Sequence, residues 1–166
     1  MPAFKAVSFD LDGTLWDSRG CADQVWEIIL PNLMQHLPED DPREVLAIYN
    51  AAFLNMVQKN GIGAVPSSHR ERFLRLLEHY GVPKKALAQE LSNRYDSTRR
   101  LSMRSHLREG AVRLLQHLRR HDITVGVITN GKPAFKRHTS GSLGLEKRLD
   151  FAAIGGIEGC EKPDPK

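Results

Sequence analysis

The chain has 166 residues, of which 40% are hydrophobic, and carries 24 Lys and Arg against 20 Asp and Glu. This composition allows a packed globular core, and the formal net charge of +4 is compatible with an anionic ligand without requiring one. The two cysteines, Cys21 and Cys160, exclude a disulfide-rich scaffold and predict a cytoplasmic location. No run approaches 18 apolar residues, so we expect no membrane partner.

The first predicted element is a buried strand over residues 4–9, which are mostly apolar and include aromatic and β-branched side chains. Asp10 then falls at the carboxyl end of this strand, where ligands bind in open α/β sheets. Asp12 follows in a turn that Gly13 permits. Two carboxylates in this arrangement can divide nucleophilic attack and proton transfer between them, and their oxygens also suit a hard cation.

A wholly helical region follows, in which apolar residues recur at helical spacing. The second of its four predicted helices has the clearest start, with Asp41 as N-cap, Pro42 at the first position and Glu44 completing a capping box. The fourth helix has the weakest pattern. The expected positions are, in order, Ala22–Leu37 with a kink or break at Pro31, Asp41 to a stop at Gly61, Ser68 to a stop at Gly81, and Pro83–Tyr95.

From Gly110 onward the pattern alternates between helix and strand. We expect a helix through Leu118, a nearly continuous apolar strand at 123–128, a helix starting at Pro133 and a short strand at 151–154. Together with the first strand, these elements predict an α/β core built on parallel strands.

Two later segments add groups that suit a phosphate. Thr129-Asn130-Gly131 follows the 123–128 strand directly and offers a hydroxyl and backbone N–H groups just before a helix, although such a run is also a common turn. Lys162 lies in a loop beside two prolines, which restrict the backbone and position its ammonium to offset phosphoryl charge.

These segments together resemble the motifs of the haloacid dehalogenase-like hydrolases. Asp10-Leu11-Asp12-Gly13-Thr14 is similar to the first motif, Thr129 to the second, and Lys162-Pro163-Asp164-Pro165 to the third. The resemblance implies that Asp10 is a nucleophile that becomes an aspartyl phosphate and that Asp12 is the general acid and later the base. It further implies that Thr129 and Lys162 hold the phosphoryl group. Candidate substrate-binding residues are Thr14, Asn130 and Gly131.

The resemblance also implies a Mg²⁺ ion bound by the Asp10 carboxylate and the main-chain carbonyl of Asp12. It implies a Rossmann-like α/β core at 1–15 and 102–166 with an inserted all-helical cap at 16–101, in which the loop at 60–66 is either a substrate selector or an ordinary connector. The fourth motif, which completes the metal site in the family, does not occur among the 166 residues. We therefore interpret the sequence as a fragment with an open apolar edge at Phe4–Asp10. Weak substitutes for the missing acids are Asp150, Glu158, Glu161 and Asp164.

The expected function is a magnesium-dependent phosphatase acting on a small phosphorylated metabolite, as a monomer or homodimer. The resemblance extends to phosphoglycolate, sugar-phosphate and acylneuraminate-phosphate phosphatases. Three alternatives remain at this point: an inactive truncated protein that only binds its ligand, a sugar phosphomutase of the same family and, least favoured, a nucleic-acid binder. A run of arginines between Arg94 and Arg120 lacks interleaved aromatic residues, so it indicates a solvated helix face and no nucleic-acid partner.

Overall fold

The computed structural model describes residues 4–38, 41–60 and 69–164. The chain divides into two compact units, one formed by Met1–Cys21 with Met103–Lys166 and the other by Ala22–Ser102. Each unit has a hydrophobic core of its own. The division falls inside the first helix, whose first residues belong to the same unit as the sheet.

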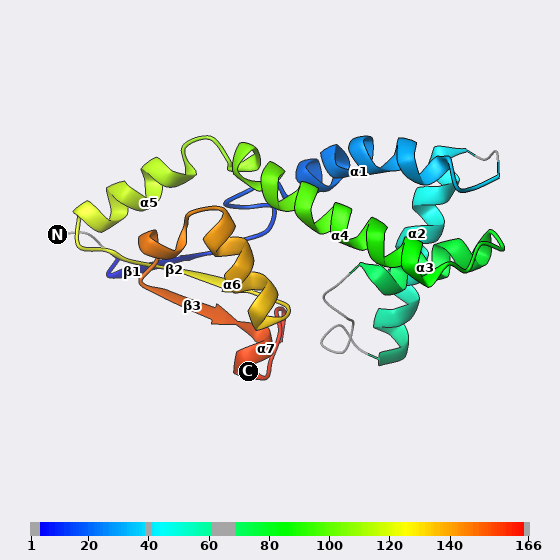
Figure 1. Ribbon diagram of the computed structural model, residues 1–166. Helices are drawn as coiled ribbons and strands as arrows, with labels where there is room; N and C mark the ends of the chain where they lie inside the picture. The colour runs from blue at the N-terminus through cyan, green and yellow to red at the C-terminus, as the bar shows by residue number, and fades with distance from the viewer. Residues whose placement is uncertain (1–3, 39–40, 61–68, 165–166) are drawn as a thin grey trace. The chain divides into compact units, whose positions relative to one another are not determined.

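A parallel sheet forms the centre of the first unit (Figure 1). Its strands are β1 (Ala6–Phe9), β2 (Thr124–Thr129) and β3 (Phe151–Ile154), in the order β1-β2-β3. Ala6 lies opposite Thr124 and Phe151 opposite Gly126, so the carboxyl ends of all three strands lie at the same end of the sheet. The predicted α/β fold with parallel strands is confirmed.

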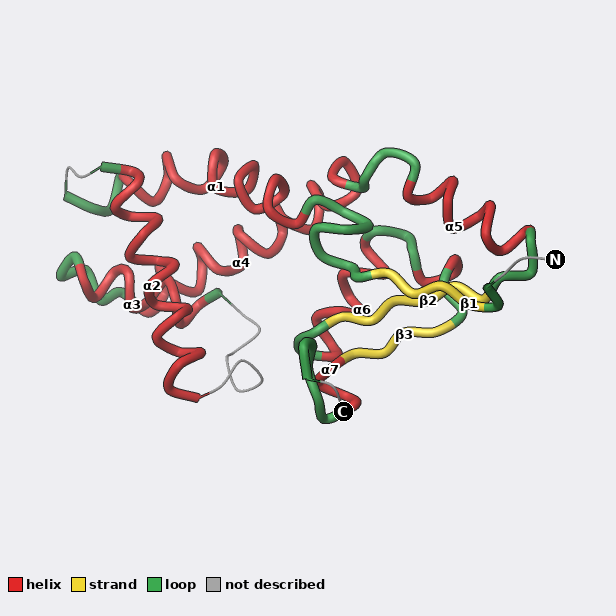
Figure 2. The backbone as a smooth tube through the Cα atoms, turned by 180° about the vertical axis from the view of Figure 1, so that it is seen from behind, coloured by secondary structure: helices red, strands yellow, loops and turns green. Residues whose placement is uncertain are grey.

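Helices α5 (Ala111–Arg120) and α6 (Pro133–Ser142) connect the strands, and the short α7 (Gly155–Glu158) follows β3. Figures 1 and 2, drawn from opposite sides, show α6 in front of the strands in one view and behind them in the other. The core of this unit joins buried side chains of β2 and α5 to those of the turns around β1 and α6, including Leu11, Trp16, Leu115, Val125, Val127 and Leu145.

The strand β1 lies at an edge of the described sheet, as expected from the sequence. Phe4, just before it, is 69% exposed, and Ile128 on β2 and Phe151 on β3 are each 40% exposed. At Gly126 an added Cβ would lie 2.3 Å from the Phe151 ring, so the ring packs where any other residue would place its side chain.

The second unit contains most of α1 (Ser18–Met34), together with α2 (Pro42–Asn60), α3 (Arg70–His79) and α4 (Lys85–Ser102). Its core is rich in aromatic rings: Trp26 lies 4.7 Å from Tyr49 between ring centroids and 5.7 Å from Tyr95. Phe73 completes this aromatic core, with its ring centroid 4.9 Å from that of Tyr49.

The helical expectations need two corrections. Pro31 does not divide α1, because Ile29 and Leu33 on either side of it are fully buried and tertiary packing sustains the helix. The fourth helix, expected at Pro83–Tyr95 from the weakest pattern, begins at Lys85 and extends to Ser102, since Leu91 and Tyr95 pack into the aromatic core.

The predicted start of α2 is confirmed at Pro42, with Asp41 Oδ1 accepting the Arg43 N–H at 2.8 Å. The expected boundary residues Gly61 and Ser68 lie outside the described residues, as does the candidate selector loop after Asn60. Among the described helices, none combines the length and apolar character needed to cross a membrane.

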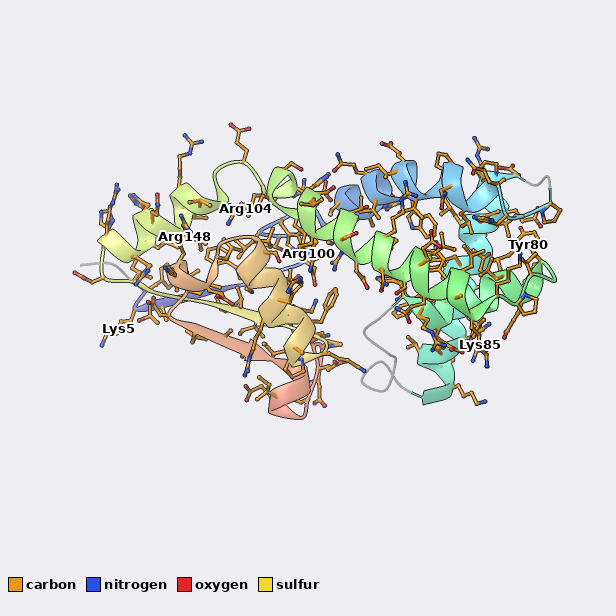
Figure 3. The ribbon with its side chains drawn as sticks, in the orientation of Figure 1. Lys5, Tyr80, Lys85, Arg100, Arg104 and Arg148 are labelled. Atoms are coloured by element: carbon orange, nitrogen blue, oxygen red, sulfur yellow. The ribbon has the colours of Figure 1, made fainter. Side chains whose placement is uncertain are left out.

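Two arginines of the basic run, Arg104 and Arg119, and Arg148 outside it bind backbone carbonyls. Arg104 Nε donates to the Ser142 carbonyl at 3.2 Å, and Arg148 donates to the Gly144 carbonyl, so both side chains meet the carboxyl end of α6 (Figure 3). Arg119 likewise donates to a main-chain carbonyl, at 2.8 Å. These arginines satisfy carbonyl groups that a helix end or turn would otherwise leave to water.

Candidate active site

Lys162 brings the first and third sequence motifs together at the carboxyl end of the sheet. Its ammonium donates to Asp10 Oδ1 at 2.7 Å and to the main-chain carbonyl of Ile128 at 2.7 Å. The contact joins residues 152 positions apart in the chain. A carboxylate at the end of β1 and an ammonium from the loop after β3 therefore face the same point.

Asp12 is held at both of its carboxylate oxygens. Trp16 Nε1 donates to Oδ1 at 2.9 Å, and the Lys136 ammonium binds Oδ2. The tight turn that presents Asp12 depends on Gly13, which has a φ of +79° and donates its N–H to the Trp16 carbonyl at 2.9 Å. The carboxylate is consequently fixed in orientation before any ligand arrives.

Lys136 was not identified from the sequence. It lies on α6 four positions after the N-cap residue Lys132, and its side chain is only 11% exposed. Its stem passes the glycine after β2, where an added Cβ on Gly131 would lie 3.1 Å from Lys136 Cε. The only signal in the sequence is a lysine in the first turns of the helix that follows the 123–128 strand.

Thr129 is the last residue of β2 and is only 3% exposed. It lines a pocket of about 210 Å³ that Lys136 also lines, together with residues of β3 such as Ile154. The structure therefore places the second motif beside the lysine that holds Asp12. Thr14 is exposed in the turn after Gly13.

Asn130 and Gly131, which are expected to bind substrate, contact the segment that follows β3. Asn130 Nδ2 donates to the Lys162 carbonyl at 2.8 Å, and the Lys162 N–H donates to Asn130 Oδ1 at 2.8 Å. The Gly131 N–H donates to Glu161 Oε1 at 3.1 Å. The polar groups of this turn are thus used to join two loops of the protein.

The donor chemistry at this end of the sheet suits a magnesium ion only in part. Asp10 and Asp12 supply hard oxygen atoms, and Mg²⁺ commonly binds one or two carboxylates with the remaining positions filled by water and phosphate oxygens. Within residues 4–38, 41–60 and 69–164 there is no group of three His, Cys, Asp or Glu side chains placed to hold a metal. The two aspartates therefore provide a partial set of ligands.

Two of the weak substitute acids are engaged elsewhere. Asp150 precedes β3 and lies at the amino end of the sheet, where its carboxylate accepts the Val125 N–H at 2.9 Å and pairs with Arg119 at 3.3 Å. Glu161 is bound to the Gly131 N–H. Asp150 is therefore excluded from a metal site beside Asp10, because the two lie at opposite ends of the strands.

The chain is also similar to known proteins of the family that its sequence motifs resemble. The family model of the haloacid dehalogenase-like hydrolases matches residues 4–166, and the chain belongs to this family. Two curated relatives are glyceraldehyde 3-phosphate phosphatases, one from Pyrococcus furiosus (28% identical, covering 100% of this chain and 65% of the relative) and one from Pyrococcus abyssi (28% identical, 98% and 64%). This chain accordingly spans just under two thirds of their length.

Solved structures show the same fold. A 2-haloacid dehalogenase from Pseudomonas syringae pv. tomato superposes with a TM-score of 0.64 at 24% identity, over 98% of this chain and 68% of that one. The hydrolase YfnB from Bacillus subtilis, a structure bound to magnesium, gives a TM-score of 0.63 at 19% identity, over 97% of this chain and 68% of that one. The expected family and fold class are thereby confirmed.

Proposed function

We propose that this protein is a phosphatase that hydrolyses a small phosphomonoester through an aspartyl phosphate on Asp10. The observation that carries the proposal is the pairing of Asp10 with Lys162 at 2.7 Å, beside a second carboxylate on Asp12 that Lys136 and Trp16 hold in place. The names of the two curated relatives make three-carbon sugar phosphates the first substrates to test.

In the proposed first step, an Asp10 carboxylate oxygen forms a bond to phosphorus while the bond from phosphorus to the ester oxygen breaks. Asp12 donates a proton to the departing oxygen, which leaves as an alcohol. Lys162 and the Thr129 hydroxyl hold the phosphoryl oxygens and offset their charge. In the second step Asp12 takes a proton from water, the resulting hydroxide attacks phosphorus, and inorganic phosphate leaves with the Asp10 carboxylate restored.

A magnesium ion is part of the proposal. The Asp10 carboxylate and the Asp12 main-chain carbonyl would hold it, and when bound it would reduce the repulsion between an anionic nucleophile and an anionic ester. The Ala22–Ser102 unit would act as the helical cap that excludes water and selects the substrate. The cytoplasmic location and the monomeric or dimeric state stay predictions.

The test is the substitution Asp10→Asn, which keeps the size of the side chain but removes the nucleophilic carboxylate. We expect turnover of p-nitrophenyl phosphate and glyceraldehyde 3-phosphate, measured with added Mg²⁺, to fall by at least about 10³-fold. Asp122→Asn is the matched control, because Asp122 is an exposed turn residue with a φ of 55°, which asparagine also tolerates. Turnover retained by the Asp10 variant would show that the nucleophile is another group.

A further inference from the structure

We propose that Asn130 is a positioning residue that acts through Lys162 and makes no contact with substrate. The proposal rests on the proposed function, because it concerns how the lysine that offsets phosphoryl charge is held. It differs from the substrate-binding role expected for Asn130 from the sequence.

The first support is that the carboxamide of Asn130 binds both sides of one backbone residue. Its Nδ2 donates to the Lys162 carbonyl and its Oδ1 accepts the Lys162 N–H, each at 2.8 Å. A planar amide that satisfies the donor and the acceptor of the same residue fixes the orientation of that residue more strongly than either hydrogen bond alone. From this fixed backbone the Lys162 side chain reaches Asp10.

The second support is the close packing of the loops that follow β2 and β3, whose carboxyl ends lie side by side in Figure 1. The Gly131 N–H donates to Glu161, and the Gly131 carbonyl accepts the Gly156 N–H at 3.3 Å. An added Cβ on Gly156 would lie 2.8 Å from the Gly131 carbonyl oxygen, and one on Gly155 would lie 2.7 Å from the Cys160 carbonyl oxygen. Gly156 therefore packs directly against Gly131 of the other loop, and neither Gly155 nor Gly156 has space for a side chain.

These contacts determine how a substitution at Asn130 should act. Because both polar atoms of the carboxamide are used by Lys162, losing them displaces the ammonium rather than removing a group from the substrate. A displacement of about 1 Å at a positioning contact can cost roughly 10²-fold in rate. The cost should vanish once the Lys162 ammonium is already absent.

A double-mutant cycle on the purified protein tests this coupling, using kcat/KM for p-nitrophenyl phosphate. We expect Asn130→Ala to lose about 10- to 100-fold in the wild-type background, and less than about twofold in a Lys162→Ala background. The matched control Gln116→Ala removes an exposed carboxamide from α5 and should change kcat/KM by less than about twofold. Equal losses in the two backgrounds would overturn the proposal, because they would mean that Asn130 acts independently of Lys162.

A measurement without substrate separates this proposal from the proposed function. Since the Lys162 N–H donates to Asn130 Oδ1, its hydrogen exchange followed by NMR should become faster in Asn130→Ala. The exchange should stay slow in Asn130→Asp, which keeps the acceptor oxygen and guards against misfolding of the alanine variant. Unchanged exchange at Lys162 in a folded Asn130→Ala would overturn the proposal. Turnover retained by Asp10→Asn would overturn the phosphatase mechanism. The exchange measurement would still decide whether Asn130 holds the backbone of Lys162.

Discussion

At the scale of single residues, Lys136 is a site residue that the sequence motifs do not identify. Asp10, Asp12 and Lys162 belong to recognisable runs of sequence, and the structure brings them to the same end of the sheet. Lys136 looks in the sequence like any lysine on a helix, because its contact with Asp12 spans 124 positions. Only the placement of α6 against the turn after β1 reveals it.

This contact predicts a dependence on the leaving group. Lys136 and Trp16 orient Asp12, the carboxylate proposed to protonate the departing oxygen. A poor leaving group needs that proton more than a good one. Lys136→Met should therefore lower kcat/KM for an alkyl phosphate roughly 10-fold more than for an activated aryl phosphate. Lys147→Met, which alters an exposed lysine, is the matched control. Equal losses for both esters would contradict the assignment of Lys136 to Asp12.

At the scale of helices and strands, the sequence predicted most where local signals were sharp. The strand at 151–154 matches β3 residue for residue, since an aspartate before it and glycines after it mark its ends. The length of α4 could not be predicted, because its stability comes from packing against Tyr49 and Trp26 on other helices. The four-residue α7 contains two glycines and carries no helical signal.

The second unit also contains a histidine at the start of α3 whose side chain is only 13% exposed. His69 shares a hydrogen bond with the Tyr49 hydroxyl, and burial, followed by the nearby Arg72 and Arg99 charges, lowers the pKa of His69 to about 3. Asp96 Oδ1 lies 3.9 Å from His69 Nε2 and would favour the charged ring, but Asp96 is 47% exposed and screened by water. The imidazole is therefore neutral in the folded protein at neutral pH.

The lowered pKa predicts that acid destabilises the protein. An unfolded histidine binds a proton below about pH 6.5, while folded His69 does not. The contribution of His69 to stability is therefore complete above that pH and is lost as pH falls toward 3. From this group alone, the free energy of unfolding should drop by about 2 kcal/mol between pH 7 and pH 5. Urea unfolding of the wild type and of His69→Gln checks this, because the variant should lose that part of the pH dependence. The same dependence of the unfolding free energy on pH in both proteins would contradict this prediction.

At the scale of the whole molecule, the two hydrophobic cores predict that each unit can be destabilised without the other. Phe73 is fully buried in the aromatic core, and truncating such a ring costs about 3–5 kcal/mol. Phe73→Ala should speed hydrogen exchange throughout the Ala22–Ser102 unit while β2 keeps its protection. Leu115→Ala, in the other core, should give the reverse pattern. Simultaneous loss of protection in both units after either substitution would show a single cooperative core.

The 152-position separation between Asp10 and Lys162 also has a consequence for biogenesis. Asp10, the proposed nucleophile, is synthesised before β2 and β3, whereas Lys162, the cation that faces it, is synthesised only after β3. A nascent chain stalled before Lys162 carries the Asp10 carboxylate without the ammonium that pairs with it. The moment at which phosphatase turnover first appears during translation would therefore report when Lys162 reaches Asp10 at the end of the sheet.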